Sequence, residues 1–397
     1  MPIKQSFQRM GRTMSMKKTI LVVIISLILT IGISVLTIES MGFDDSLPPT
    51  MQLRILETTD LHAHLMDYSY TREEPTVEFG LVRTASLIRE ARREVQNSLL
   101  FDNGDLIQGN ALADYVANVR GLMLGEPHPV YQAMNLLKYD AATVGNHEFN
   151  YGLDFLEDTL EEANFPYVNA NIYVDDHNNV EIDDLNYYNP YTILKRTMID
   201  SNGKKHKLKI GVIGFVTPLI MEWDRDKLKG KLKVKSIAKT AENFIPIMKQ
   251  KGADIIIALA HIGLDSSISA NNKIENTIYP LSKIKGIDAI LFGHTHQVFP
   301  DKTETITIDG IDVKKGTVNG VPAVQAGKWG NHLGLIDLQL EEINGKWKVV
   351  NAQSFTRPIF KKVREKSYPL VKPNNTIINA VKAIHEETLR YLKEKGR

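Results

Sequence analysis

Five short clusters of metal-type ligands are spaced along this chain, and they are the part of the sequence that could carry out chemistry. Each combines Asp, Asn, Glu or His side chains with a glycine or with the end of an apolar run. They are Asp60-Leu61-His62, Gly104-Asp105, Gly145-Asn146-His147-Glu148, His261 and Gly293-His294-Thr295-His296. All the donors are oxygen or nitrogen atoms, and the chain has no cysteine to supply a thiolate. Such donors suit two divalent cations that share an aspartate, and a pair of this kind activates water for attack on phosphorus.

The residue types favour a paired-metal site over separate structural roles. Asp105 follows a glycine, and a carboxylate with two oxygens is the natural bridge between two cations. Asn146 offers a neutral oxygen, which keeps the site positive enough to bind a phosphate anion. His147 beside it could donate to a developing oxyanion or to the leaving group, so it is the candidate catalytic residue. Each motif alone has an ordinary alternative, such as a helix cap, an Asn-Gly turn or a hydrogen-bonded core histidine.

Two further histidines end very apolar runs. Asp254–Ala260 and Ile287–Phe292 are predicted to be buried strands of a parallel sheet, and His261 and His294 follow them. An unpaired imidazole buried there would be costly, which favours ligation. His294 and His296, two apart in a loop, could reach two cations or opposite sides of one. Neutral imidazole suits Mn²⁺, Zn²⁺, Co²⁺ and Fe²⁺ alike, so the metal stays open.

Alternating strands and helices precede the clusters and must position them. The hydrophobic spacing predicts strands at Leu53–Thr58, Ser98–Phe101, Ala141–Val144 and Lys207–Phe215, and helices at Gly80–Val95, Val130–Leu137, Tyr151–Ala163 and Ile237–Gln250. Four of the five clusters therefore come just after the carboxyl end of a strand, where ligand sites of α/β sheets form. His62 follows the same rule one turn later.

The character of the sequence changes beyond His296. Hairpin-like strands are predicted at Thr305–Ile308, Thr317–Ala323, Gly334–Leu340 and Trp347–Ala352. The Lys- and Pro-rich stretch Ile359–Pro373 is predicted to be a linker. Asn375–Lys395 is predicted to be a closing helix, with an apolar stripe for which the sequence shows no packing partner.

The N-terminal segment predicts export. Lys17 and Lys18 precede an apolar run from Ile20 to Ile38, which is typical of a signal peptide. The run approaches the roughly 20 residues that cross a bilayer, so residues 1–40 are expected to be a signal peptide or a signal-anchor that tethers the chain to a membrane. A buried core helix is the remaining alternative. The first two would place the following residues in the periplasm, at the cell surface or in the medium.

Composition excludes one class of partner. The chain of 397 residues carries 48 Lys and Arg against 47 Asp and Glu, a formal net charge of +1. It therefore has no overall basic field for polymeric nucleic acid.

The sequence around the clusters resembles that of the calcineurin-type metallophosphoesterase superfamily. Within this superfamily it resembles the bacterial 2′,3′-cyclic-nucleotide 2′-phosphodiesterase/3′-nucleotidase branch of the 5′-nucleotidase family. The resemblance rests on Leu-Glu-Thr-Thr-Asp-Leu-His (56–62), Asp-Asn-Gly-Asp-Leu-Ile-Gln-Gly (102–109), Gly-Asn-His-Glu-Phe-Asn-Tyr-Gly (145–152) and Phe-Gly-His-Thr-His (292–296). It implies an α/β (α+β) fold, a four-layer αββα sandwich, with the catalytic domain at 51–360 and a linker and interdomain-type helix at 361–397. It also implies two metal sites that share Asp105: Asp60, His62, Asp105 and His296 for one, and Asp105, Asn146, His261 and His294 for the other.

The implied activity is hydrolysis of 2′,3′-cyclic nucleotides to 3′-nucleotides, and of these to nucleoside and phosphate, with His147 as the catalytic imidazole. Asn150 stands where 5′-nucleotidases place an aspartate behind this histidine, which favours the cyclic-phosphodiesterase branch over a 5′-nucleotidase or UDP-sugar-type hydrolase. His64 departs from that branch, which usually has asparagine there. By the same resemblance, family members carry a second, C-terminal domain that binds the nucleoside. This chain is expected to lack that domain, because it stops at the predicted interdomain-type helix Asn375–Lys395. Base recognition, supply of that domain by another chain, and a truncated, non-catalytic surface remnant therefore stay open.

Overall fold

The computed structural model describes residues 49–396, apart from 124, 126, 179, 265–276, 302 and 304–307. The signal or anchor expected at 1–40 and most of the strand expected at 305–308 lie outside the described residues. Among the helices of the described part, none combines the length and the apolar character that a membrane span requires.

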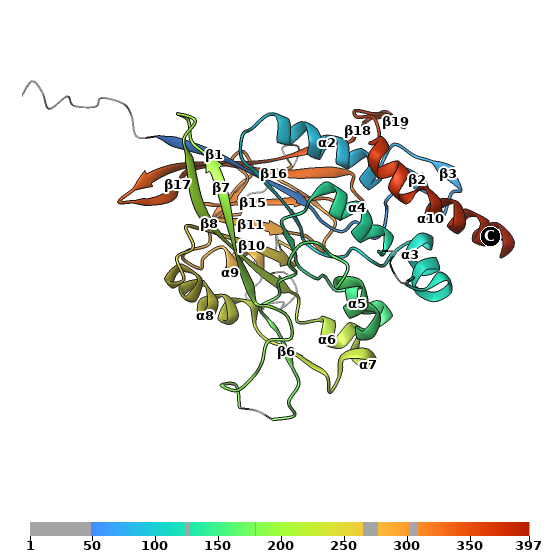
Figure 1. Ribbon diagram of the computed structural model, residues 1–397, viewed down its shortest axis with the longest axis horizontal. Coiled ribbons are helices and arrows are strands. Elements are labelled where there is room, and N and C mark those ends of the chain that lie inside the picture. The colour runs from blue at the N-terminus through green and yellow to red at the C-terminus, as the bar shows by residue number, and fades with distance from the viewer. Residues whose placement is uncertain are drawn as a thin grey trace, which may run out of the picture. The chain divides into compact units, whose positions relative to one another are not determined.

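Two β-sheets pack face to face at the centre of the described part of the chain (Figure 1). The five-stranded sheet has the order β17 (Lys346–Pro358), β16 (His332–Ile343), β1 (Thr50–Thr58), β4 (Ser98–Asp102) and β5 (Ala141–Ala142). The eight-stranded sheet has the order β13 (Ile311–Asp312), β14 (Thr317–Val318), β15 (Val321–Ala326), β11 (Ala289–Phe292), β10 (Ile255–His261), β8 (Lys205–Val216) and β7 (Tyr191–Ile199), with β12 (Val298–Phe299) on β15. Strands β1, β4 and β5 are parallel, as are β8, β10, β11 and β15.

Helices cover both outer faces, which gives the four layers that the family resemblance implies. The five-stranded sheet is covered by α2 (Leu81–Arg93), α4 (Pro129–Leu137), α5 (Leu153–Leu160) and α10 (Asn375–Glu394), and the eight-stranded sheet by α8 (Ile237–Gln250) and α9 (Ile278–Leu281). Successive side chains of β1 point to opposite faces of the sheet and so pack in two cores. Leu53 and Ile55 face the other sheet, and Leu56 faces the helices. The αββα sandwich is confirmed.

The remaining elements are short. They are α3 (Ala111–Tyr115), α6 (Ile220–Trp223), α7 (Arg225–Leu228), the turns of helix η1 (Val116–Arg120) and η2 (His147–Tyr151), and three strand pairs: β2 (Tyr68–Ser69) with β3 (Glu74–Pro75), β6 (Ile172–Val174) with β9 (Leu232–Val234), and β18 (Phe360–Val363) with β19 (Lys366–Pro369).

Glycine-containing turns interrupt two elements that the sequence predicts to be continuous. The helix expected at 151–163 begins as η2 and resumes as α5, because Gly152 between them has a φ of 91°. The strand expected at 317–323 is the hairpin β14–β15, since Asn319 and Gly320 both adopt positive φ and form its turn.

The C-terminal segment corrects two expectations. The stretch 359–373, expected to be a linker, contains the hairpin β18–β19. Helix α10 has the expected bounds to within a residue, but its apolar stripe is packed. Ile377, Val381 and Ile384 are buried in the same core as residues of α2 and α4. The expectation of an unpartnered stripe is therefore wrong, because α10 lies across helices whose apolar side chains it covers.

Candidate metal centre

The seven predicted ligands and His147 converge because the strands that carry them end at one place. Asp60 and His62 follow β1, Asp105 follows β4, Asn146 and His147 follow β5, His261 ends β10, and His294 and His296 follow β11. Each sheet therefore supplies part of the cluster.

One group of donors consists of Asp60, His62, Asp105 and His296, whose ligand atoms all lie within 4.8 Å of one another. His62 Nε2 lies 3.0 Å from His296 Nε2 and 3.8 Å from Asp105 Oδ2. His296 Nε2 lies 3.4 Å from Asp60 Oδ1. Four oxygen and nitrogen donors thus face one point.

A second group contains Asp105, His261 and His294 under the same distance limit. Asp105 Oδ2 lies 3.1 Å from His261 Nε2, and Asn146 Oδ1 lies 2.9 Å from His294 Nδ1. Asp105 belongs to both groups, which is the position that a bridging carboxylate requires.

The hydrogen bonds of two histidines test whether a cation fits here. The Nδ1 atom of His62 donates to the carbonyl oxygen of Gln108 at 2.8 Å, and that of His261 to the carbonyl of Asn103 at 2.7 Å. Because a carbonyl only accepts, both Nε2 atoms are left for the cluster, as in metal-binding histidines. His261 Nε2 is buried without a hydrogen bond, although Asp105 Oδ2 is 3.1 Å away. A positive charge between the two atoms stabilises that arrangement, and a bound divalent cation would supply it.

The pKa values of Asp60, Asp105 and His261 also indicate that the cluster favours a positive charge. Burial opposes ionisation of Asp105, but His261 and His62 outweigh burial and lower its pKa. Burial likewise opposes ionisation of Asp60, and His296 and His261 reverse its effect. Burial lowers the pKa of His261, yet Asp105 and Asp60 outweigh it and raise the pKa to about 10. Both carboxylates are therefore ionised at neutral pH, and their surroundings favour a cation.

The backbone is strained where the ligands sit. Positive φ angles occur at Asp60 (51°), His62 (45°), Asp105 (58°), His294 (73°) and His296 (59°). A left-handed conformation costs an L-residue about 1–2 kcal/mol, and such strain concentrates at functional sites. Glycine makes room for the turns, because a Cβ atom on Gly293 would lie 2.7 Å from Asp60 Oδ2.

Glu148 fastens two of these turns together. It is fully buried, and its carboxylate accepts from the backbone N–H groups of Asp105 at 2.8 Å and Gly145 at 2.6 Å, as well as from that of Leu106. Glu148 therefore orients the loop that carries Asp105 and takes no direct part in the cluster.

His147 lies against the cluster and is tied to a residue that the sequence did not reveal. Its backbone N–H donates to Asp105 Oδ1 at 2.8 Å, and its Nδ1 atom lies 2.7 Å from Asn150 Oδ1. Asn150 Nδ2 lies 3.1 Å from both carboxylate oxygens of Asp224. Asp224 is 5% exposed and stands 74 positions from Asn150. It belongs to no local motif, so only co-variation with position 150 could have indicated it.

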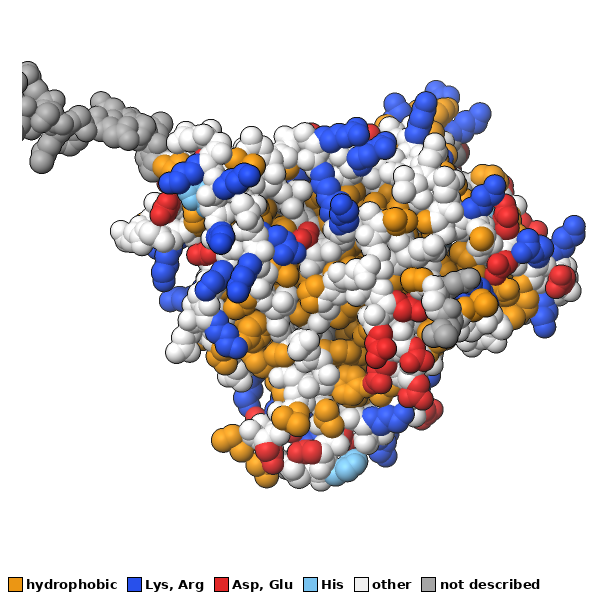
Figure 2. Space-filling model, viewed as in Figure 1, with side chains coloured by type: hydrophobic (Ala, Val, Ile, Leu, Met, Phe, Trp, Pro, Cys, Tyr) orange, Lys and Arg blue, Asp and Glu red, His pale blue; other side chains and the backbone are white. Residues whose placement is uncertain are grey.

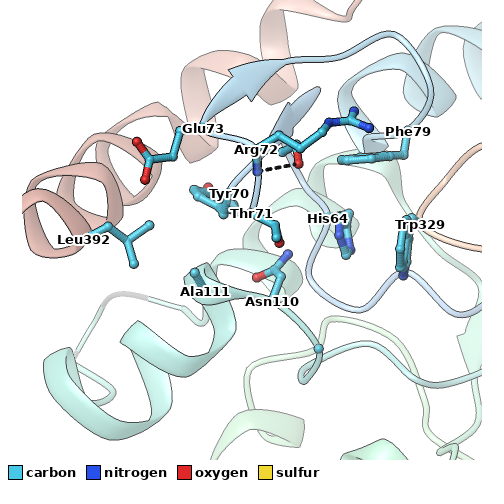
Figure 3. Close-up of a pocket in the computed structure, with 12 residues that line it drawn as sticks. His64, Tyr70, Thr71, Arg72, Glu73, Phe79, Asn110, Ala111, Trp329 and Leu392 are labelled. Atoms are coloured by element: carbon cyan, nitrogen blue, oxygen red, sulfur yellow. Dashed lines mark hydrogen bonds between the residues drawn. The ribbon is translucent and has the colours of Figure 1, made fainter. Parts of the chain in front are cut away.

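An aromatic-lined cavity of about 700 Å³ lies near the cluster (Figure 3), and Gly109, which packs against His62, is one of its lining residues. His64 and Trp329 stack there with ring centroids 4.5 Å apart, and Asn110 and Thr71 lie on the other side of His64. The backbone N–H of Trp329 donates to the carbonyl oxygen of Asp60 at 2.7 Å. One wall of the cavity therefore also supports the metal-ligand loop.

Comparison with known proteins agrees with this geometry. Residues 53–298 match the model of the calcineurin-like phosphoesterase family. The chain is 48% identical over 345 residues to the 2′,3′-cyclic-nucleotide 2′-phosphodiesterase/3′-nucleotidase of Salmonella typhimurium, covering 87% of this chain and 52% of that protein. It is 44% identical over 355 residues to the trifunctional nucleotide phosphoesterase protein YfkN of Bacillus subtilis, covering 88% of this chain and 23% of that protein.

A crystal structure supports the same assignment. The calcineurin-like phosphoesterase YfkN from Bacillus subtilis superimposes with a TM-score of 0.79 at 44% identity, over 87% of this chain and 100% of that chain. The present chain spans about half the length of the Salmonella typhimurium protein that it matches. The chain belongs to the calcineurin-like phosphoesterase family.

Proposed function

We propose that this protein is a two-metal phosphoesterase that hydrolyses 2′,3′-cyclic nucleotides to 3′-nucleotides, and 3′-nucleotides to nucleoside and phosphate. The observation that carries the proposal is Asp105, whose carboxylate belongs to two groups of donors at once. The preference for cyclic diesters rests on the 48% identical Salmonella typhimurium protein of that name and on Asn150, which by the family resemblance stands where 5′-nucleotidases have an aspartate.

The residues divide into two ligand sets. Asp60, His62, Asp105 and His296 would hold one cation, and Asp105, Asn146, His261 and His294 the other. When bound, a pair of Mn²⁺, Zn²⁺, Co²⁺ or Fe²⁺ ions supplies Lewis-acid charge at the phosphoryl oxygens and lowers the pKa of attacking water. The neutral amide of Asn146 in place of a third carboxylate leaves net positive charge for a phosphate anion.

His147 takes the remaining task. Its Nδ1 atom is engaged by Asn150, so Nε2 is the nitrogen that meets the substrate. From there it would donate a hydrogen bond to a phosphoryl oxygen or a proton to the departing ribose oxygen, a contribution typically worth about 10²–10⁴ in rate.

Substrate comparison tests the proposal. Wild-type protein loaded with Mn²⁺ or Zn²⁺ should turn over bis(p-nitrophenyl) phosphate and should prefer 2′,3′-cAMP and 3′-AMP to 5′-AMP. Asp105→Asn should abolish turnover of all these substrates and His147→Ala that of 2′,3′-cAMP and 3′-AMP, whereas His177→Ala, at a side chain 72% exposed, should leave turnover unchanged. Preference for 5′-AMP would move the assignment to a 5′-nucleotidase or UDP-sugar hydrolase. No bound metal after repletion would favour a non-catalytic remnant.

The two ligand sets and His147 can recognise the phosphate group of the substrate. Selectivity for one base over another is not part of this proposal. We assign the substrate to single nucleotides because the net charge is only +1, and on the face in Figure 2 Lys and Arg side chains are interspersed with uncharged ones. Export, with or without a membrane tether, remains a proposal that rests on the sequence pattern of residues 1–40. Sequencing the N-terminus of the mature protein distinguishes a cleaved signal from an anchor.

A further inference from the structure

Three polar side chains, those of His147, Asn150 and Asp224, form a hydrogen-bonded chain that leads away from the metal cluster. His147 Nδ1 lies 2.7 Å from Asn150 Oδ1, and Asn150 Nδ2 lies 3.1 Å from each carboxylate oxygen of Asp224. Lys227 Nζ lies 3.1 Å from Asp224 Oδ1 and balances its charge. The chain thus ends in a carboxylate that is 5% exposed.

The direction of every hydrogen bond in this chain follows from chemistry. An ionised carboxylate only accepts, so the amide of Asn150 must turn its NH₂ group toward Asp224. Its carbonyl oxygen then faces His147 and can only accept, so Nδ1 of His147 must carry the hydrogen. Asp224 therefore decides, through a neutral amide, which nitrogen of His147 is free to act.

The side chain of Asp224 contacts Asn150 and does not cap the helix that it precedes. It stands at the N-cap of α7, where an aspartate side chain normally accepts from the first N–H groups of the helix. Here it makes no capping hydrogen bond. Both of its oxygens face Asn150 instead, across 74 positions of sequence. The neighbouring Trp223 lies over the ring of His294, with centroids 5.5 Å apart, so the same segment contacts the metal cluster.

We infer that Asp224, acting through Asn150, is a positioning residue that holds His147 in the Nδ1–H tautomer with Nε2 directed at the leaving oxygen. The inference rests on the proposed hydrolysis for its kinetic consequence, and on geometry alone for the tautomer. In a direct carboxylate–histidine pair, one aspartate fixes the tautomer of the histidine. Here Asp224 and Asn150 together take that role.

A charge exchange between the two positions tests it. In Asp224→Asn the amide of Asn150 loses its fixed orientation, and kcat for 2′,3′-cAMP should fall on the order of 100-fold with little change in KM. Asn150→Asp should also lose activity, because two carboxylates then face each other. The double variant Asn150→Asp/Asp224→Asn restores one carboxylate and one amide in reversed order, and it should recover most of kcat. Asp226→Asn, the same change at an exposed neighbour in α7, is the matched control.

The leaving group provides a second comparison. Bis(p-nitrophenyl) phosphate releases a stable phenolate that needs little protonation, so Asp224→Asn should lose less activity on it than on 2′,3′-cAMP. Equal losses on both substrates, or a double variant no better than the worse single variant, would overturn the inference.

The tautomer can be read without any activity, which separates this inference from the proposed hydrolysis. Long-range proton–nitrogen correlation spectra of the Zn²⁺-loaded protein distinguish Nδ1–H from Nε2–H histidines, and His147→Ala assigns the signal among the 11 histidines. Wild-type and double-variant proteins should show Nδ1–H at His147, and Asp224→Asn should show Nε2–H or a mixture. Should Asp224→Asn not fold, Asn150→Ala removes the same link and should give the same shift. An unchanged Nδ1–H signal in the folded variant would refute the role of Asp224 even in a fully active enzyme.

Discussion

Replacing Gly109 by alanine should weaken metal binding as well as lower stability, because this glycine packs directly against the predicted ligand His62. Gly109 has a φ of 132°, and a Cβ atom there would lie 2.7 Å from His62 Nδ1 and 2.8 Å from His62 Cβ. The ring of His62 is fixed from the same side by its hydrogen bond to the carbonyl of Gln108, the residue before Gly109. The methyl group and the ring cannot share that space, so His62 must move away from Asp105 and His296.

The magnitude has two parts. An L-residue in this region of φ costs about 1–3 kcal/mol of strain, which lowers the free energy of unfolding with or without metal. Displacing His62 also breaks the bond that fixes its ring, and loss of such support typically lowers metal affinity about 10–100-fold. At about 1.4 kcal/mol for each factor of ten, that is about 1.4–2.8 kcal/mol more, seen only when metal is present.

Gly121→Ala is the matched control, because Gly121 also has a positive φ, 72°, but a Cβ atom there meets nothing within 4 Å. Urea unfolding of chelator-treated protein should show a loss of about 1–3 kcal/mol in both variants. Competition with a chelating dye should show weakened metal binding in Gly109→Ala alone. If Gly109→Ala binds two cations as tightly as the wild type, His62 is not a ligand and the first donor set is wrong.

Three further outcomes are expected. Chelation should lower the Tm, since metal at 100 times its Kd stabilises the folded state by about 2.7 kcal/mol, and Asp105→Asn should be insensitive to the chelator. Burial, with Asp60 and Asp102, raises the pKa of the fully buried Glu57 well above its ordinary 4.5, so the folded state keeps a proton that the unfolded chain releases. That contribution is present below pH 4.5 and is lost as pH rises, so the unfolding free energy of Glu57→Gln relative to wild type should increase from pH 5 to pH 8 in urea titrations. Ile377→Ala should cost about 2–5 kcal/mol in the same assay if α10 packs as described, and Ile378→Ala, at a partly exposed neighbour, should cost less.

The convergence of the cluster could be predicted from the sequence because each element carried its own local signal. The buried strand Ile255–His261 reads as an unbroken apolar run, and the polar residue that ends it must lie at the carboxyl edge of a parallel sheet. The same reasoning applied to β1, β4, β5 and β11 brings all seven predicted ligands together, and the structure does so. Their individual roles as ligands stay predictions that metal titration of single variants will test.

What the sequence could not supply depends on tertiary contacts without a periodic pattern. The apolar stripe of α10 was readable, but its partners on α2 and α4 were not, since helix packing leaves no mark on spacing. Asp224 gave no signal because its function requires Asn150, which is distant in the chain and lies on a different element. The hairpin β18–β19 was hidden by lysine and proline, which are common in linkers and also occur on exposed edge strands.

The position of the cluster at the seam between the sheets has a consequence for stability. Asp60, His62, Asp105 and Asn146 come from the five-stranded sheet, and His261, His294 and His296 from the other. The pairing of Asp105 with His261 therefore crosses the seam, and so does that of Asp60 with His296. Because the two sheets otherwise meet through apolar side chains such as Leu53 and Leu259, cations at the seam would add polar bonds to a hydrophobic interface. Metal binding and sheet packing are then one equilibrium, and a core substitution such as Leu259→Ala should weaken metal affinity without touching a ligand.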